Sequence, residues 1–403
     1  MTGLLALLPA ALAQDCTVFF EGVTAYLPDG PQEGVSVRVA GARIDAVGAE
    51  LSGEGCAATI DGRGRVLTPG LIDPNARIGL VEVGLEDATH NDGGGHAAYG
   101  VYDGYNPRSS VVPVVRIAGL TSAIVMPERG RVSGQAAAVD LAGATQADAV
   151  IDPSVAMVAH IGNNAAEGLD ELRTLLDDAR AFGANPTAYD QNRTRTLGAS
   201  RRDLEALQPV LKGDLPLVIG ADKAADIEAV LRFARDQRVR VVIRGAAEGW
   251  LVADQLAEAE VPVILDPLVY GPGSFDQIHG RADNPALLHA AGVPIMFGTG
   301  SAHFARALPQ LAGNAVRGGL DHDAALVAIT ATPAEVFGLT DYGRIEPGAM
   351  ANLVLWSGDP LELSTHVLSV HIRGRDIPLE SRQTKLQERY LELPGTPTPP
   401  TLK

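Results

Sequence analysis

The most informative segment of the chain reads Val66-Leu-Thr-Pro-Gly-Leu-Ile-Asp-Pro-Asn-Ala-Arg-Ile-Gly-Leu80. Its first half is largely apolar and predicts a buried strand that ends at Asp73-Pro74. Asn75 and Arg77 follow at a spacing of two. Side chains two positions apart on an extended segment point to the same face. We therefore expect an amide and a guanidinium group to project together from the end of this strand.

The length and composition of the chain indicate a globular protein with a large core. It has 403 residues, of which 46% are hydrophobic, and its 45 glycines and 26 prolines indicate many turns. This length suits a barrel of about 250 residues with a smaller accessory domain. The formal net charge of −17 argues against nucleic acid and anionic membrane surfaces as partners. No segment approaches the ~20 apolar residues of a membrane-spanning helix, so no membrane span is predicted.

Residues 1–13 have the pattern of a signal peptide. Leu4–Leu12 form a short apolar region, and Ala11-Leu-Ala13 fits the small-X-small cleavage rule. A buried N-terminal strand or helix is the alternative, because no Lys or Arg precedes the apolar region. The signal-peptide interpretation predicts an exported protein, located in the periplasm or outside the cell.

Cys16 and Cys56 are the only two cysteines, and both flank predicted strands of a small N-terminal sheet. An exported location favours a disulfide between them, and two free thiols are the alternative. Their spacing matches no metal site.

Strand-like segments recur along the chain, first in an N-terminal group and then in alternation with helical patterns. The N-terminal group covers 17–20, 35–39 and 43–47. The later strands cover 121–126, 155–159, 215–219, 239–243, 261–265 and 293–297, with helices predicted over 226–235 and 250–256. Continuously apolar strands that alternate with helices are typical of a parallel sheet covered on both faces. Together with the opening strand these make seven, and the pattern does not locate an eighth.

The 66–80 segment resembles the opening signature of the amidohydrolase superfamily, in which Pro-Gly-(Leu/Phe)-Ile-Asp precedes a His-X-His pair at the end of the first barrel strand. The run Gly343-Arg-Ile-Glu-Pro-Gly-Ala-Met-Ala-Asn-Leu-Val354 is similar to the C-terminal signature Gly-X-Ile-X-X-Gly-X-X-Ala-Asp-Leu-Val of that family, with Asn352 at the usual Asp. The helical run 324–339 lies between them in the expected order. The resemblance covers residues 16–385 and is to imidazolonepropionase-type, exported members.

The resemblance implies an α/β fold, namely a TIM-like (β/α)8 barrel with a composite β-sandwich formed by N- and C-terminal segments. We expect the sandwich over 14–66 plus 342–385 and the barrel over 67–341. The proline-rich end of the chain, 386–403, is predicted to be a disordered tail.

The resemblance also implies a site for zinc or a similar divalent metal, but the residues at the family's five chemical positions differ from the usual ligands. The His-X-His pair is replaced by Asn75 and Arg77, and the two later histidines by Asp222 and Arg244. Gly300 replaces the Asp that binds metal and acts as general base. Arginine is permanently cationic and repels a metal ion. We therefore predict no metal and no cofactor, and no catalytic residue is assigned.

Three interpretations of these replacements remain open. The two arginines could form a salt-bridged plug with Asp222, or they could bind a carboxylate or phosphate group of a ligand. Other residues could also rebuild a site near the barrel mouth. The candidates are the glycine-rich loop with His90, Asp92 and His96, then His160 at the end of a strand, and His303 beside Gly300. An ordinary solvent-facing loop and hydrogen-bonded structural histidines are the alternatives.

The leading functional hypothesis is a pseudoenzyme that has lost metal-dependent hydrolysis of C–N bonds. It would act as a binding or partner subunit, as a homo-oligomer or beside an active amidohydrolase paralogue. The first alternative is an active hydrolase acting on carbon–nitrogen (non-peptide) bonds of a small amide or cyclic amide through a non-standard site. The second is a receptor in which Arg77 and Arg244 capture a small anionic ligand.

Overall fold

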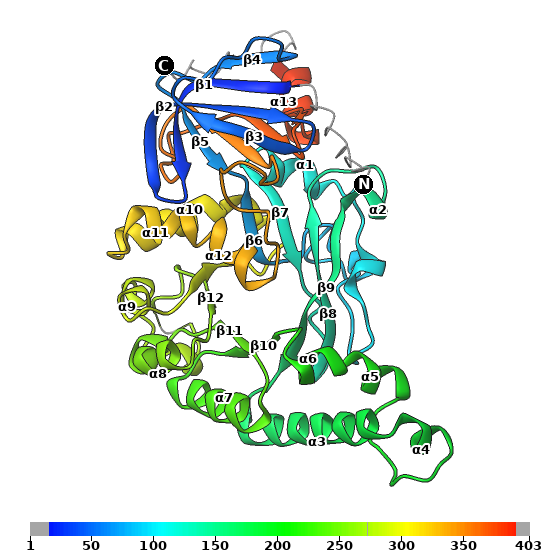
Figure 1. Cartoon of the computed structure of the whole chain (residues 1–403). Coiled ribbons are helices and arrows are strands. Elements are labelled where there is room, and N and C mark those ends of the chain that lie inside the picture. The colour runs from blue at the N-terminus through cyan, green and yellow to red at the C-terminus, as the bar shows by residue number, and fades with distance from the viewer. Residues whose placement is uncertain (1–15, 272, 392–403) are drawn as a thin grey trace, which may run out of the picture.

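The computed structural model describes residues 16–271 and 273–391, which form two eight-stranded sheets and surrounding helices. Figure 1 shows one sheet at the top, built from blue and orange segments, and the second sheet below it with most of the helices. Within the described ranges, no helix is long and apolar enough to cross a membrane. The predicted signal peptide, residues 1–13, lies outside the described residues.

The lower sheet is a nearly closed barrel with the strand order β13-β12-β11-β10-β9-β8-β7-β6. Its strands are β6 (Leu71–Ala76), β7 (Leu120–Val125), β8 (Val132–Asp140), β9 (Val150–His160), β10 (Leu217–Ala221), β11 (Val241–Gly245), β12 (Val263–Leu265) and β13 (Ile295–Phe297). Backbone hydrogen bonds close the ring beyond the end of β13. The Gly300 amide donates to the Asn75 carbonyl at 2.8 Å, and the Arg77 amide donates to the Ser301 carbonyl at 3.0 Å. The expected TIM-like barrel is confirmed.

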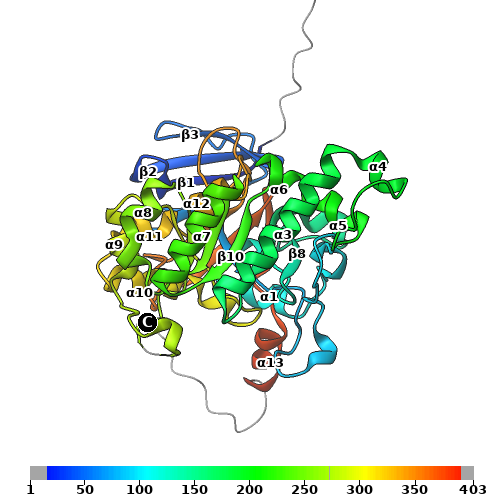
Figure 2. The ribbon, with the colours of Figure 1, turned by 90° about the horizontal axis from the view of Figure 1, so that it is seen from below.

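Helices follow most of these strands and pack on the outside of the barrel. The α-helices of the barrel region are α1 (Val111–Arg116), α2 (Gln146–Ala149), α3 (Ala165–Ala184), α4 (Pro186–Asp190), α5 (Arg201–Ala206), α6 (Gln208–Lys212), α7 (Ala224–Gln237), α8 (Ala253–Glu258), α9 (Asn284–Ala290), α10 (Leu308–Arg317), α11 (His322–Val327) and α12 (Ala331–Val336). The 3-10 helices are η1 (Asp87–Thr89), η2 (Val101–Gly104), η3 (Gly249–Val252), η4 (Phe275–Gln277) and η5 (Phe304–Ala307). Seen from below, α3 and α7 lie side by side next to β10 (Figure 2).

The barrel departs from a regular (β/α)8 scheme at β8, the strand that the sequence pattern did not locate. β8 pairs antiparallel with both β7 and β9. Only residues 126–131 connect β7 to β8, and a parallel crossover needs about a dozen residues or more. The strand is buried but consists mainly of small residues such as Ala136, Ala137 and Ala138, so it lacks the apolar signal of its neighbours.

The barrel interior is filled by apolar side chains in register. Val158, Val218 and Val242 pair across β9, β10 and β11 and are all buried. The next layer toward the carboxyl ends contains Ile264 and Met296. Burial of both faces of these strands explains why they are continuously apolar in the sequence.

The upper sheet joins strands from both ends of the chain. Its order is β16-β15-β14-β5-β1-β2-β3, with β4 beside β1. The strands are β1 (Cys16–Leu27), β2 (Gly30–Ala40), β3 (Arg43–Gly48), β4 (Ala58–Asp61), β5 (Val66–Pro69), β14 (Leu353–Trp356), β15 (Val367–Ile372) and β16 (Arg375–Ile377). The C-terminal strand β14 pairs antiparallel with β5, which gives the composite sandwich. The two cysteines, for which a disulfide or two free thiols were open, are bonded to each other.

The single strand predicted over 66–72 is two strands in two different sheets. β5 belongs to the sandwich and β6 to the barrel, and Gly70 lies between them. A Cβ atom at Gly70 would lie 2.1 Å from the Thr121 hydroxyl oxygen, so only glycine lets the chain pass β7 at this distance. The segment that carries the family signature is therefore the covalent link between the two sheets.

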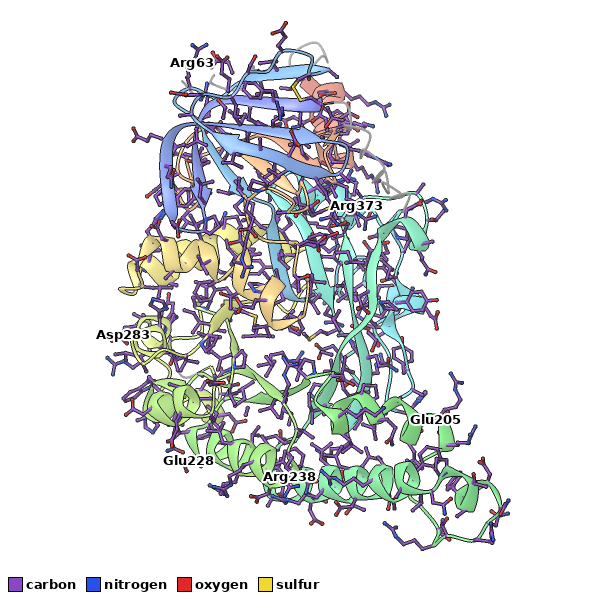
Figure 3. The ribbon with its side chains drawn as sticks, in the orientation of Figure 1. Arg63, Glu205, Glu228, Arg238, Asp283 and Arg373 are labelled. Atoms are coloured by element: carbon purple, nitrogen blue, oxygen red, sulfur yellow. A yellow bond between two sulfur atoms is a disulfide. The ribbon has the colours of Figure 1, made fainter. Side chains whose placement is uncertain are left out.

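A buried polar network joins the two sheets near this link. Asp140 is 1% exposed and accepts hydrogen bonds from Ser122 Oγ at 2.9 Å and from Asn352 Nδ2 at 2.8 Å. Its other oxygen accepts from the Tyr342 hydroxyl at 3.0 Å and from Arg373 Nε at 2.6 Å. Figure 3 shows Arg373 at the junction of the sandwich with the barrel. An aspartate at 352 would face Asp140 with a second carboxylate, which explains the asparagine here.

The predicted disordered tail over 386–403 is wrong for its first residues. Helix α13 covers Arg382–Leu391 and contacts α1, so 386–391 are helical. The sequence 382–391 lacks proline and has a helical pattern, whereas the prolines begin at Pro394. Residues 392–403 lie outside the described part of the chain.

Candidate functional site at the barrel mouth

A cavity of about 430 Å³ lies at the carboxyl ends of the barrel strands. Four of the five family positions line it, namely Asn75, Asp222, Arg244 and Gly300. They come from β6 and from the ends of β10, β11 and β13, whose carboxyl ends meet at one face of the barrel. The tertiary structure thus brings these four positions to one site.

Strand register sets the position of Arg244. His160, Gly220 and Arg244 are paired across β9, β10 and β11, and Arg244 pairs in turn with Ile264 on β12. Paired residues on neighbouring strands share a face, so Arg244 lies in the layer above the buried Val242. Its Nη1 atom donates to Glu128 Oε1 at 2.8 Å and to Asn75 Oδ1 at 3.3 Å.

Arg77 does not line this cavity. Its Nε atom donates to Asp92 Oδ2 at 2.6 Å, and its Nη2 atom contacts the same oxygen. Asp92 is only 2% exposed, so this pair anchors the glycine-rich loop against the end of β6. Arg77 therefore has a structural role, because it holds the glycine-rich loop in place.

The three polar residues of the glycine-rich loop do not converge on one point. His90 lies 3.9 Å from Asp92, and its Nε2 atom lies 3.1 Å from the Val83 carbonyl oxygen. His96 instead contacts Asp203 on α5 at 2.9 Å. The loop is held by these separate contacts, which do not assemble a site from His90, Asp92 and His96.

Asp222 faces the cavity without contacting either arginine. Its Oδ2 atom accepts from Gln277 Nε2 at 3.0 Å, and Oδ1 accepts from the Ala247 amide at 3.3 Å. Burial raises the pKa of Asp222, and the nearby Asp276 and Glu248 raise it further. The expected plug of Arg77, Asp222 and Arg244 is therefore not formed. Each arginine has its own carboxylate, and that partner comes from a loop.

His160 and His303 are also held outside the cavity. The Nε2 atom of His160 is buried without a hydrogen-bond partner, and burial followed by the charge of Arg244 lowers the pKa of this imidazole. His303 Nε2 lies 2.7 Å from the Glu82 carbonyl oxygen. Neither histidine is among the lining residues.

Four acidic residues that line the cavity, Glu128, Asp226, Asp266 and Asp276, were not identified as site residues from the sequence, and two of them follow barrel strands. Asp266 follows β12, and Glu128 lies in the β7–β8 connection. Burial raises the pKa of Asp266, whose carboxylate accepts one hydrogen bond, from the Leu268 amide at 2.9 Å. A signal was present, because each of these two acids comes directly or shortly after a predicted apolar strand, as Asp222 does.

Asp73 is the most deeply buried acid near the mouth and ties β6 to the segment after β13. It accepts from the Asn75 amide at 2.9 Å, the Thr299 amide at 3.3 Å and the Thr299 hydroxyl at 2.5 Å. Burial raises the pKa of Asp73 to about 7, although these hydrogen bonds lower it. Its contacts are internal to the barrel closure, so its role is to hold Asn75 and Gly300 in place.

The donor set at the mouth does not fit a divalent metal. In the described ranges, no three His, Cys, Asp or Glu side chains gather closely enough to hold a metal ion. A zinc site needs three or four such ligands. Here one family position is a cation, one an amide and one a glycine, and Arg244 already contacts the amide of Asn75. We therefore derive no step through a metal.

The fold and the cavity define a TIM-like barrel protein with a composite sandwich. The model of the amidohydrolase family matches residues 277–381. The matched residues include part of the barrel and part of the sandwich, so the chain is similar to the amidohydrolase family in both.

Solved structures with a similar fold include several hydrolases. An amidohydrolase from Thermotoga maritima MSB8 is 22% identical, with a TM-score of 0.81 over 90% of this chain and 100% of that one. Atrazine chlorohydrolase from Arthrobacter aurescens TC1, complexed with zinc and atraton, is 19% identical, with a TM-score of 0.56 over 93% and 99%. A prolidase complexed with N-methylphosphonate-L-proline is 16% identical, with a TM-score of 0.56 over 89% and 99%. No curated protein sequence matches the chain.

Proposed function

We propose that the barrel mouth of this protein binds a small molecule and does not carry out the metal-dependent hydrolysis of C–N bonds. The proposal rests on one observation: the guanidinium group of Arg244 contacts Asn75 and Glu128 in the cavity. A fixed positive charge thus lies among the family's ligand positions. Two unit charges about 4 Å apart interact by roughly 4 kcal/mol in a partly buried environment, and a divalent ion doubles the repulsion.

The open volume of the mouth supports binding over a purely structural plug. Small-molecule sites usually have volumes of roughly 300–1,000 Å³, and the cavity of about 430 Å³ lies within that range. Its walls combine apolar side chains such as Ile264 and Leu265 with polar groups from several strands. A decayed site filled by its own ion pairs would leave no such space.

An anionic ligand has less support than the sequence suggested. Arg77 is turned toward Asp92, and Arg244 is paired with Glu128. A ligand carboxylate or phosphate would have to displace one of these protein carboxylates. The receptor for an acidic small molecule is therefore not the function that we propose.

We further propose that the protein is exported and acts as a binding subunit. The disulfide between Cys16 and Cys56 supports an oxidising compartment, and the apolar N-terminal segment supports secretion. A second copy of the chain or an active amidohydrolase paralogue is the proposed type of partner. Fractionation of cells that make the full chain tests export, and co-purification tests the partner.

Metal analysis of the purified full chain tests the proposed loss of metal chemistry. The protein is incubated with zinc, dialysed, and assayed for bound metal and for hydrolysis of small amides and cyclic amides. We expect no stoichiometric zinc and no chelator-sensitive turnover. Tightly held zinc together with turnover that a chelator abolishes would overturn the proposal.

A metal-free hydrolase is the second candidate, and the raised pKa values of Asp222 and Asp266 favour it. Carboxyl groups whose pKa is raised by burial can serve as acid and base near neutral pH. One carboxylate would take a proton from a water molecule while the oxygen of that water attacks the carbonyl carbon of the amide. The other carboxyl group would protonate the nitrogen that leaves when the C–N bond breaks. Chelator-insensitive amide hydrolysis that Asp222→Asn and Asp266→Asn each abolish would support this function over simple binding.

A further inference from the structure

We infer that the ligand of the barrel mouth is a small organic cation, an ammonium or guanidinium compound, held by the carboxylates of Asp222 and Asp266. This inference rests on the proposed binding function of the same cavity and names its ligand class. It follows from the charges that line the cavity and from how they are paired.

Acidic side chains outnumber basic ones in the cavity wall. Five carboxylates line it, those of Glu128, Asp222, Asp226, Asp266 and Asp276, and Arg244 is the single cationic side chain among the described lining residues. This negative excess lies in a concave site whose protein walls focus the field of the charges, so a cation is attracted to it.

Three of these carboxylates already have cationic partners. Glu128 is paired with Arg244 at 2.8 Å. Lys223 bridges Asp226 at 3.3 Å and Asp276 at 3.1 Å. These acids are therefore compensated by the protein itself.

Asp222 and Asp266 have only neutral hydrogen-bond donors. Asp222 accepts from the Gln277 amide and the Ala247 backbone, and Asp266 accepts from the Leu268 backbone. In the described ranges neither acid has an ion-pair partner, and burial raises the pKa of both. A cationic ligand would supply the charge that these two carboxylates lack.

The buried Glu248 does not line the cavity, but its backbone amide donates to the Asp222 carbonyl at 2.9 Å, so it adds negative charge near Asp222. It is 6% exposed and accepts hydrogen bonds from the backbone amides of Ala224 and His279, at 3.0 and 3.3 Å. It also raises the pKa of Asp222, so its charge is felt at the cavity. Anions are therefore disfavoured at the Asp222 side.

An organic cation fits the cavity better than a metal ion does. A divalent ion needs its ligands within about 2–2.6 Å of one point, and the described residues offer no such group of three. The donors of an ammonium or guanidinium compound are spread over several atoms and can reach separate carboxylates. The apolar side chains of Ile161, Ile264 and Val269 would contact the methylene groups of such a ligand.

Binding of three small probes to the full chain tests the inference. Agmatine and butylammonium are the cationic probes, and succinate is the anionic probe of similar length. We expect the two cations, but not succinate, to raise the melting temperature and to give a binding isotherm in calorimetry. Loss of one charge-assisted hydrogen bond weakens binding by about tenfold or more, so Asp222→Asn and Asp266→Asn should each lower agmatine affinity by at least that factor.

Asp170→Asn is the matched control, because Asp170 is an exposed residue of α3 outside the cavity. Its agmatine affinity should equal that of the wild type. Absence of binding by both cations, or equal affinity in all three variants, would overturn the inference. Binding of succinate that depends on Arg244 would show that the ligand is not a cation, but the proposed binding function would remain. Zinc-dependent turnover would instead contradict the proposed binding function itself.

Discussion

Nη1 of Arg244 on β11 lies 2.8 Å from Oε1 of Glu128, which follows β7. β7 and β11 are four strands apart in the eight-stranded sheet, so this single ion pair reaches across the barrel mouth. The same guanidinium contacts Asn75 on β6. Arg244, at a position where the resembled family has a histidine, therefore acts through contacts with segments more than a hundred residues away in the chain.

Arg244→Ala should destabilise the protein by about 1–3 kcal/mol, because it leaves Glu128 partly buried without a partner. Glu128→Ala in the same background should recover part of this loss. The measurement is a double-mutant cycle of unfolding free energies in urea. A coupling energy near zero would show that the pair contributes nothing to the closed mouth.

Asp73 should make the stability of the protein fall as pH rises from about 4 to about 7. Its pKa is about 7 in the fold against an ordinary value of 3.8, so the folded state keeps a proton that the unfolded state releases. Protonated Asp73 contributes roughly 4 kcal/mol to the stability of the fold when the pH is below the pKa of this residue in the unfolded chain. This contribution decreases as the pH rises and is gone once the pH exceeds the pKa of Asp73 in the folded protein.

Asp73→Asn tests this assignment, because asparagine keeps the shape and cannot ionise. Unfolding free energies of wild type and variant are compared across this pH range. The variant should have the flatter profile. Parallel profiles for the two proteins would contradict the raised pKa of Asp73.

Asn352→Asp should destabilise the protein by about 1–3 kcal/mol at neutral pH, because it places a carboxylate against Asp140 and removes two donated hydrogen bonds. The loss should be smaller in acid, where one of the two carboxyl groups is protonated. Asn352→Ala removes the same donors without adding charge and is the control. An equal loss for both variants at every pH would argue against repulsion as the cause.

Gly70→Ala should destabilise the protein by about 1–3 kcal/mol or more, because the new Cβ atom would lie 2.1 Å from the Thr121 hydroxyl oxygen. Gly84→Ala is the matched control, since a Cβ atom there meets nothing within 4 Å. Thermal unfolding of both variants measures the difference. Equal melting temperatures would mean that β5 and β6 can shift relative to β7.

Much of the fold could be predicted because local patterns of apolar and polar residues indicate it. The continuously apolar strands, the helix now seen as α7 and the two signature segments indicate a barrel with a composite sandwich. β8 was missed because its small residues give no apolar signal, and the helical start of the tail was missed because the prolines after it dominated the interpretation.

The residue types at the five family positions were also readable in the sequence, but their partners were not. Asp92 and Glu128 were not identified as the acids that pair with Arg77 and Arg244, and Asp266 was not noticed at all. Nothing in the local sequence couples these residues to one another.

Local composition was enough to define most of the barrel strands and the residue types at the five positions that correspond to the family's ligands. The pairing of those side chains, the open cavity and its unbalanced carboxylates emerge only in the folded barrel. The physical reason is that ion pairs form within a few ångströms and depend on strand register and closure, which bring together residues far apart in the chain. The sequence thus indicates that Asp222 and Arg244 lie at the barrel mouth, whereas only the tertiary structure shows that Asp222 and Asp266 lack an ion-pair partner there among the described residues.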